Sequence, residues 1–316
     1  MMRFLLGLLA FLTALAPAVA QTPAPVTIRI AATPGDEVTP VLYAQKMGLF
    51  AGAGLDVRIE RLTSGSAIAA AVAGGSIDIG KSSLLPIISA HDHGVPFTLI
   101  APGLLWLTGS PTAGLVAATA TTVNSGKDLE GKTLSTSALK DLGEIGIRSW
   151  IDSHGGDSRT VHFVEVPSPS VVAALDSGRI AAGNLVDPVL SDGLATGKIH
   201  VIGRPDDAIA KRFLTTAWFA DAGYVAKNRS AVEAFERIVM NATQYTNEHP
   251  AEMLPIIAPF WGLAPDVLAK MNRGTNGVTL AARDIQPLVD AAARYGAIAK
   301  SFNAAELISP AALKGR

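Results

Sequence analysis

The most restrictive feature of this 316-residue sequence is an internal repeat at a constant offset of 103 residues. The offset carries Gly75 onto Gly178 and Gly80 onto Gly183, and each copy reads strand, turn, helix, strand, helix, strand. Strands that alternate with helices predict parallel βαβ units with right-handed crossovers. Two copies therefore predict two similar α/β lobes.

The chain after the second copy does not make a third copy. We expect the C-terminal part to return and complete the first lobe, with the two crossings near the ends of the second copy. This predicts one lobe from residues 21–112 and 219–316 and a second lobe from residues 113–218. Because the chain crosses twice, the two segments together form a hinge.

The first 20 residues form a segment of their own. Arg3 precedes a run over residues 4–15 that is dominated by Leu, Phe and Ala, and Ala18 and Ala20 provide a small-x-small cleavage site. The pattern predicts a secretory signal peptide, cleaved after Ala20, and hence a periplasmic protein. A retained membrane helix is the weaker interpretation, since 12 residues span only about 18 Å.

Composition excludes several function classes. The sequence has 26 Lys and Arg against 27 Asp and Glu, no Cys, and 49% apolar residues. This balance is too neutral for a nucleic-acid-binding protein and too apolar for a disordered chain. The absence of Cys also excludes thiol nucleophiles, zinc ribbons, iron–sulfur clusters and disulfides.

Function is expected at the carboxyl ends of the strands, where open parallel sheets bind ligands. Loops there begin helices with Ser, Thr or Gly, whose free N–H groups suit an anion. A small organic anion in the interlobe cleft is the predicted ligand. The candidate ligand-binding residues are Thr33, Pro34, Gly35, Asp36, Ser64, Gly65, Ser66, Lys81, Ser82 and Ser83 in the first lobe, Ser135, Thr136, Ser137, Asn184 and Asp187 in the second, and Trp218 near the second crossing.

Each candidate also has a structural explanation. Lys81 either neutralises a carboxylate or sulfonate, or is a surface lysine paired with an acid. Residues 64–66 and 135–137 either offer donors to a ligand or cap helices. For Asp187, capping the helix that starts at Pro188 is favoured over binding a ligand amine.

Aromatic and histidine residues are also open to two interpretations. Trp106 and Trp218 lie near the predicted crossings, where they either stack on a flat ligand or pack at the hinge. His91 and His93 flank Asp92 but lack an evident third ligand, so a solvated helix end is favoured over a metal site. No metal site is therefore predicted.

Catalytic motifs give no support for an enzyme. Ser137 and Lys140 match the S-x-x-K pattern of serine acyltransferases, but no Lys-Thr-Gly strand follows. The sequence contains neither G-x-S-x-G nor H-E-x-x-H. We therefore expect no catalytic residue, no cofactor and no enzymatic activity.

Several segments carry a family resemblance. Residues 46–57 read KMGLFAGAGLDV and resemble the K-x-G-L-F-x-x-x-G-L-D-V segment of periplasmic binding proteins of the nitrate, sulfonate, taurine and thiamine-precursor (NMT1/THI5-like) type. Further matching segments follow in the family's order: AGGSIDIG at 73–80, DLEGK at 128–132, LDSGRIAA at 175–182 and NLVDP at 184–188. The resemblance covers residues 26 to about 220.

This resemblance implies a type II periplasmic-binding-protein fold, with two parallel-sheet Rossmann-like lobes joined by a two-segment hinge. It also implies a monomer that closes on a small-molecule ligand and delivers it to an ABC permease and its ATPase. Alternatives on the same fold are a chorismate-dehydratase-like lyase, a pyrimidine synthase that is its own histidine donor, and a periplasmic ligand sensor. The export signal counts against the lyase, and the missing cysteines count against the synthase.

Overall fold

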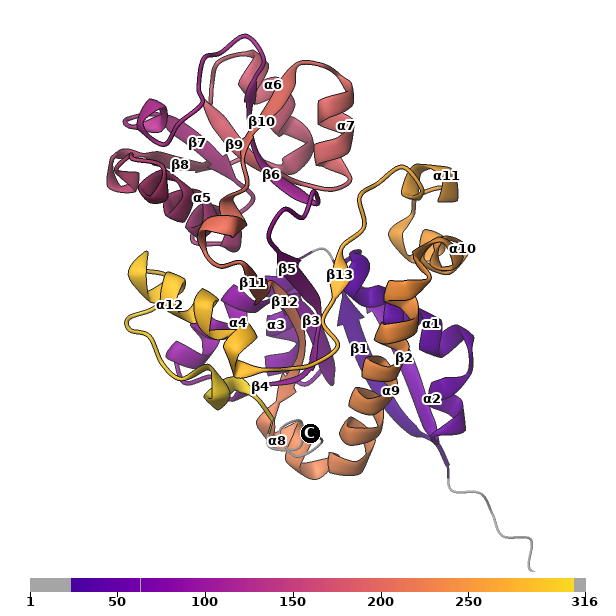
Figure 1. The fold of residues 1–316 in the computed structure, drawn as a ribbon. Helices are drawn as coiled ribbons and strands as arrows, with labels where there is room; N and C mark the ends of the chain where they lie inside the picture. The colour runs from indigo at the N-terminus through magenta and orange to yellow at the C-terminus, as the bar shows by residue number, and fades with distance from the viewer. Residues whose placement is uncertain (1–23, 63, 310–316) are drawn as a thin grey trace, which may run out of the picture.

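The computed structural model describes residues 24–62 and 64–309, so the predicted signal peptide lies outside the described residues. The chain forms two α/β lobes, each built on a five-stranded sheet, and a third sheet of three short strands lies where the chain crosses between them (Figure 1). The prediction of two α/β lobes is confirmed.

The sheet of the first lobe has the strand order β2-β1-β3-β12-β4. The first three strands are parallel, and β12 pairs antiparallel with both β3 and β4. The strands are β1 (Val26–Ala32), β2 (Leu55–Arg61), β3 (Ile79–Ser83), β4 (Phe97–Pro102) and β12 (Thr216–Asp221).

The sheet of the second lobe has the order β10-β6-β9-β7-β8. Strands β8, β7 and β9 are parallel, and β6 is antiparallel to β9 and β10. The strands are β6 (Ala113–Ala118), β7 (Thr133–Thr136), β8 (His162–Glu165), β9 (Ala182–Val186) and β10 (Ile199–Gly203). The third sheet contains β5 (Leu104–Leu107), β11 (Arg212–Leu214) and β13 (Thr275–Asn276).

Helices cover both lobes. Those of the first lobe are α1 (Thr39–Lys46), α2 (Leu49–Gly52), α3 (Gly65–Ala73), α4 (Leu84–Asp92), α8 (Ala222–Lys227), α9 (Arg229–Glu248), α10 (Pro250–Trp261), α11 (Pro265–Leu268) and α12 (Gln286–Arg294). Those of the second are α5 (Leu142–Ser153), α6 (Val171–Asp176) and α7 (Val189–Ala195). Among the described residues, no helix combines the length and apolar character needed to cross a bilayer.

The offset of 103 residues extends to the strand register. In the first lobe Thr216 pairs with Ser83, and in the second Ala113 pairs with Val186, so both partners are displaced by the same offset. Strand β12 is thus the counterpart of β6, although the two lie in different lobes. Each copy of the repeat supplies a strand to the sheet of the other lobe.

This exchange adds antiparallel strands to the two predicted parallel-sheet lobes. The exchanged strands enter each sheet from the crossing, at the carboxyl ends of the parallel strands. A strand that enters at that edge can run only antiparallel to its neighbours. Both sheets are therefore mixed, and only the βαβ portions follow the predicted parallel order.

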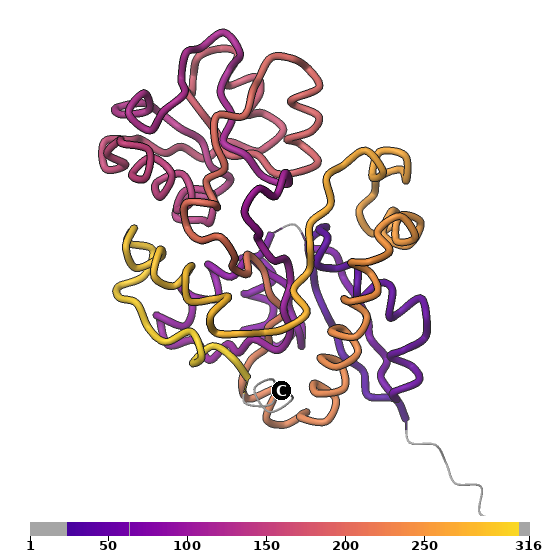
Figure 2. The backbone as a smooth tube through the Cα atoms, viewed as in Figure 1, coloured from indigo at the N-terminus to yellow at the C-terminus, as the bar shows by residue number. Residues whose placement is uncertain are grey.

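The chain path shows the two crossings (Figure 2). The chain leaves the first lobe after β5, returns through β11 and β12, and ends with helices that lie against the first lobe. The domain boundaries at residues 112/113 and 218/219 stay a prediction. Strand β12 already lies in the first sheet from Thr216 onward.

The second crossing packs closely on α5 of the second lobe. A Cβ atom at Gly203 would collide with Trp150, and one at Gly146 would lie 3.0 Å from Asp206 Oδ1. Asp206 lies in a short 3₁₀ helix, Pro205–Ala208, and is 6% exposed. Burial, with the nearby charges of Asp207 and Asp141 adding to it, raises the pKa of Asp206 to about 7.

We predict that Asp206 makes stability depend on pH. The Asp206 carboxyl binds its proton more tightly in the folded state than in the unfolded state. Its contribution to the free energy of unfolding is therefore fully present below the unfolded pKa of 3.8 and is lost as pH rises through about 7. Asp206→Asn, which stays neutral, should flatten the fall in melting temperature between those values. Thermal unfolding across a pH series measures this, with Asp266→Asn in α11 as the exposed control. A variant with the unchanged parental profile would contradict the prediction.

Candidate functional site

The carboxyl edges of the two sheets lie at the crossings. Thr216 begins β12 opposite the last residue of β3, and Ala113 begins β6 opposite the last residue of β9. The chain needs only residues 108–112 to pass from β5 to β6. Arg204 Nη1 donates a hydrogen bond of 2.5 Å to the carbonyl oxygen of Ala113, which links the two crossings. The loops that follow the parallel strands therefore lie on edges that face one another.

In the first lobe, Lys81 joins two of the predicted loops. Lys81 Nζ donates to Thr33 Oγ1 and to Glu37 Oε1, at 2.5 Å each. Lys81 is 2% exposed and Glu37 is 7% exposed, so this is a buried ion pair. Of the two interpretations of Lys81, the structure shows the pairing with an acid, although the lysine is buried and not on the surface. A ligand contact by Lys81 stays a prediction.

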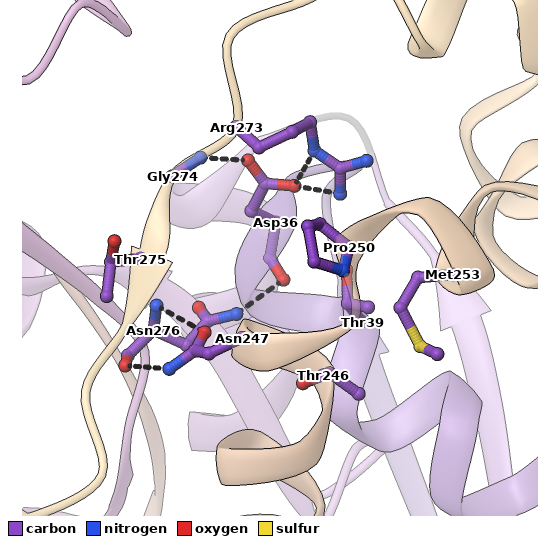
Figure 3. A pocket seen from close by; sticks show the side chains of 10 residues that line it. All are labelled: Asp36, Thr39, Thr246, Asn247, Pro250, Met253, Arg273, Gly274, Thr275 and Asn276. Atoms are coloured by element: carbon purple, nitrogen blue, oxygen red, sulfur yellow. Dashed lines mark hydrogen bonds and ion pairs between the residues drawn. The ribbon is translucent and has the colours of Figure 1, made fainter.

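The rest of the first loop is held by the C-terminal part of the chain. Asp36 accepts hydrogen bonds from Arg273 Nε at 2.7 Å, from Arg273 Nη2, and from the backbone N–H of Gly274 at 2.6 Å (Figure 3). Burial raises the pKa of Asp36, although the charge of Arg273 opposes the shift. Pro34 and Gly35 lie between these anchors, and a Cβ at Gly35 would collide with the Glu37 carboxylate.

The start of α3 meets the end of β3. Ser64 caps the helix by accepting from Ala67 N at 3.2 Å, and its Oγ lies 3.1 Å from Ser66 Oγ. A Cβ at Gly65 would collide with Ser82 Oγ, so only glycine allows this approach. Ser82 is 1% exposed and its hydroxyl has no hydrogen-bond partner.

Ser83 is the residue that precedes α4, and its side chain makes no capping hydrogen bond. The capping interpretation therefore holds for Ser64 but leaves the Ser82 hydroxyl unexplained. A buried polar group without a partner requires an explanation. Ser82 is accordingly the strongest candidate for a ligand contact in the first lobe.

In the second lobe, Asp141 gathers the loop after β7. Asp141 accepts from Thr136 Oγ1 and Ser137 Oγ, at 2.5 Å each, and caps α5 through Glu144 N at 2.9 Å. Ser135 is fully buried without a partner, next to Gly183. Two of the three predicted hydroxyls therefore orient Asp141, a residue that the sequence analysis did not single out.

The loop after β9 brings two further predicted residues to the same edge. Asn184 Nδ2 and Thr136 Oγ1 both lie about 3 Å from the position of a Cβ on Gly143, so their side chains are neighbours. Asp187 Oδ1 caps α7, accepting from Ser191 N at 3.0 Å and Ser191 Oγ at 2.6 Å, as the favoured interpretation predicted. Asn184 Oδ1 and Asp187 Oδ2 are buried acceptors without partners.

The two tryptophans do not face a ligand. Trp218 is 0% exposed in the middle of β12 and packs edge-on against Phe235, 5.9 Å between ring centroids. The predicted ligand contact of Trp218 is therefore corrected to core packing, because the residue faces the helical layer of its own lobe. Trp106 is also buried, and its Nε1 donates to Asp207 Oδ1 at 2.9 Å at the crossing.

The side chains of the segment 91–93 contact separate partners and do not converge on one point. His93 Nδ1 lies 2.7 Å from the carbonyl oxygen of Ser89, whereas Asp92 accepts from Ala299 N at 3.0 Å. In the part of the chain that the structure describes, no three His, Asp or Glu side chains are grouped to hold a metal ion.

Besides Asp141, the candidate site contains two charged residues that were not predicted from the sequence, Glu37 and Arg273. Glu37 lies four residues beyond Thr33, just after the first predicted loop, so it was the acid closest to that loop after Asp36 when a partner for Lys81 was considered. Arg273 lies 237 residues from Asp36, and nothing local in the sequence connects the two.

Comparison with known proteins gives a family match. The model of the family described as "NMT1/THI5 like" matches residues 36–253. Among solved structures, the periplasmic aliphatic sulphonate-binding protein of Escherichia coli is 17% identical, with a TM-score of 0.71 over 90% of this chain and 92% of that one. The periplasmic nitrate-binding protein of Synechocystis is 16% identical, with a TM-score of 0.63 over 77% and 69%.

The curated relatives are named as enzymes, whereas these structural neighbours are named as binding proteins. The 4-amino-5-hydroxymethyl-2-methylpyrimidine phosphate synthase of Schizosaccharomyces pombe is 23% identical over 225 residues, 65% of this chain and 60% of the relative. A protein of the same name from Legionella pneumophila is 28% identical over 108 residues, 34% and 31% of the two chains. The chain thus spans less than two thirds of these relatives. The expectation of no enzymatic activity is contradicted, because the relatives are named as enzymes.

We predict that the Lys81–Glu37 pair contributes to stability. Lys81→Met leaves the Glu37 carboxylate buried without its partner and should lower the free energy of unfolding by about 3–5 kcal/mol. Lys81→Met combined with Glu37→Leu should regain most of the loss, since it removes both charges. Urea unfolding measures both variants.

The control for this pair is Lys198→Met, in an ion pair with Asp176 whose side chains are 56% and 55% exposed. It should change the free energy of unfolding by at most about 1 kcal/mol. Lys81→Met with parental stability would contradict the assignment of a buried ion pair.

Proposed function

Since the chain belongs to the NMT1/THI5-like family, we propose that it is an exported solute-binding protein that captures a small organic anion between its lobes and delivers it to an ABC importer. Its structural neighbours include periplasmic proteins named for binding aliphatic sulphonate and nitrate, and a protein named as the ligand-binding component of an ABC-type import system. The proposal names a sulfonate, a carboxylate or a similar anion as the ligand.

One observation carries the proposal: the exchanged strands place the carboxyl edges of both sheets at the crossings, facing one another. A ligand between these edges contacts loops of both lobes only when the lobes are closed. The ligand therefore shifts the open–closed equilibrium by its differential affinity for the two states.

The unpaired groups suggest how the ligand is oriented. The first lobe offers the Ser82 hydroxyl and the N-terminus of α3 as donors, and the nine-residue helix α3 supports an anion there. The second lobe offers the acceptors Asn184 Oδ1 and Asp187 Oδ2. Because Glu37 compensates Lys81, hydrogen-bond donors rather than a free lysine would hold the anion. The ligand's own N–H or O–H donor would face the second lobe.

The biological setting belongs to the same proposal. Cleavage after Ala20 would release the protein into the periplasm, where it would act as a monomer and dock on a permease with its ATPase. No nucleic-acid partner is proposed, since the formal net charge of the chain is −1. A periplasmic sensor would use the same binding step. Growth on the ligand in a permease-deletion strain distinguishes the role in transport from the role in sensing.

A second candidate function rests on the curated relatives, which are named as pyrimidine phosphate synthases. Expression of residues 21–316 in the cytoplasm of a bacterium that lacks this synthase tests it. Growth without added pyrimidine would support synthase activity, and no growth from a well-expressed, folded chain would count against it.

We predict that a thermal-shift screen raises the melting temperature for one class of small acid, because selective ligands stabilise the folded state. The panel includes alkanesulfonates, carboxylates, nitrate and the pyrimidine phosphate named above. Ser82→Ala should weaken binding of that acid about tenfold, the typical effect of losing a hydrogen bond to a charged group. Titration calorimetry measures the affinity.

The unliganded melting temperature of Ser82→Ala should match the parent, because the hydroxyl has no partner to lose. Thr98→Val, at the opposite end of the same sheet, is the control and should keep the parental affinity. The proposal fails if no acid stabilises the chain, or if small-angle scattering shows no compaction at saturating ligand.

A further inference from the structure

A polar cavity lies wholly within the first lobe, apart from the candidate interlobe site (Figure 3). Its volume is about 150 Å³. Three segments that are far apart in sequence form its walls: the 3₁₀ helix Asp36–Val38 with the start of α1, the junction of α9 and α10, and the segment that contains β13. The lining residues include Asp36, Thr39, Pro250, Met253 and Arg273. No lining residue belongs to the second sheet or its helices.

Two hydrogen-bond donors in this cavity have no partner. Thr39 is 3% exposed, and its Oγ1 is buried and unpaired. Arg273 uses Nε and Nη2 on Asp36, which leaves Nη1 buried and unpaired. The Arg273 guanidinium also lies 5.5 Å from the centroid of the Trp261 ring, which holds it in place.

A helix end adds to this donor set. The twelve-residue helix α10 begins at Pro250, and Pro250 and Met253 of its first turn line the cavity. No side chain caps this end of the helix. Free N–H groups and the positive end of the helix dipole favour a negatively charged group here.

The remaining walls limit the size and shape of a guest. The side chains of Pro250 and Met253 provide an apolar surface beside the donors (Figure 3). On the other side of the cavity, Asn247 Nδ2 donates to the carbonyl oxygen of Asn276 at 2.8 Å, and the backbone N–H of Asn276 donates to Asn247 Oδ1 at 3.0 Å. A cavity of this volume can hold a molecule of about six heavy atoms, the size of benzene, so a guest of that size fits.

We propose that this cavity is a second binding site, for a short-chain monocarboxylate such as butyrate. The carboxylate accepts hydrogen bonds from Arg273 Nη1 and Thr39 Oγ1 near the start of α10, and the alkyl chain lies against Met253 and Pro250. Asp36 occupies the Nε and Nη2 side of Arg273, so the guest takes the side that remains. The site goes beyond the proposed interlobe function and does not depend on it.

Titration of the full chain with sodium butyrate, followed by ligand-observed NMR and calorimetry, tests this site. Saturable binding at millimolar butyrate is expected, with butyramide, which has the same shape without the charge, binding much more weakly. Thr39→Val keeps the side-chain shape and removes the hydroxyl, so it should weaken butyrate binding about tenfold. Its thermal unfolding should match the parent, since Thr39 Oγ1 loses no partner.

Two controls locate the binding. Thr243→Val removes a buried hydroxyl from α9 that bonds to Val239 O and does not line the cavity, so it should leave butyrate affinity unchanged. Ser82→Ala should also leave it unchanged, which separates this site from the interlobe site. The proposal is overturned if butyrate does not bind saturably, if butyramide binds equally well, or if Thr39→Val retains the parental affinity.

Discussion

The arrangement of the whole molecule depends on one pairing that occurs twice. Strand β12 pairs antiparallel with β3, and β6 pairs antiparallel with β9 at equivalent positions of the repeat. Because each exchanged strand must start at the carboxyl edge of its sheet, the crossings, the loops and the helix N-termini all gather there. The exchanged strands are therefore the reason that the carboxyl edges of the two sheets face one another.

Charge compensation then decides what this edge can bind. Lys81 and Glu37 neutralise each other in a buried pair, and Arg273 and Asp36 do the same beside it. Among the groups left without partners at this edge, the first lobe offers the Ser82 hydroxyl, and the second offers the Ser135 hydroxyl and the acceptors Asn184 Oδ1 and Asp187 Oδ2. The candidate site thus offers hydrogen bonds and a helix dipole more than net charge. Such a site discriminates ligands by the position of their donors and acceptors, because an unpaired polar group is costly to bury.

The same geometry is compatible with both groups of relatives. Structural neighbours named as sulfonate- and nitrate-binding proteins share the fold at less than 20% identity, while the curated relatives named as pyrimidine phosphate synthases share 23–28% identity over part of their length. A cleft that closes on a small polar molecule serves capture and chemistry equally well. Fold alone therefore does not choose between these functions, which depend on individual side chains in the site.

The sequence by itself determined the two α/β lobes, the offset of 103 residues, the loops at the carboxyl ends and the capping role of Asp187, because all of these follow from local patterns of strands, glycines and helix starts. Only the tertiary structure decided that β6 and β12 are exchanged, that Trp218 lies in the core, and that Glu37 compensates Lys81. The pairing of Asp36 with Arg273, 237 residues away, belongs to the same group. Strand direction, burial and ion pairing depend on contacts between segments that are distant in sequence. Local periodicity does not indicate which distant segment packs against a given strand or helix.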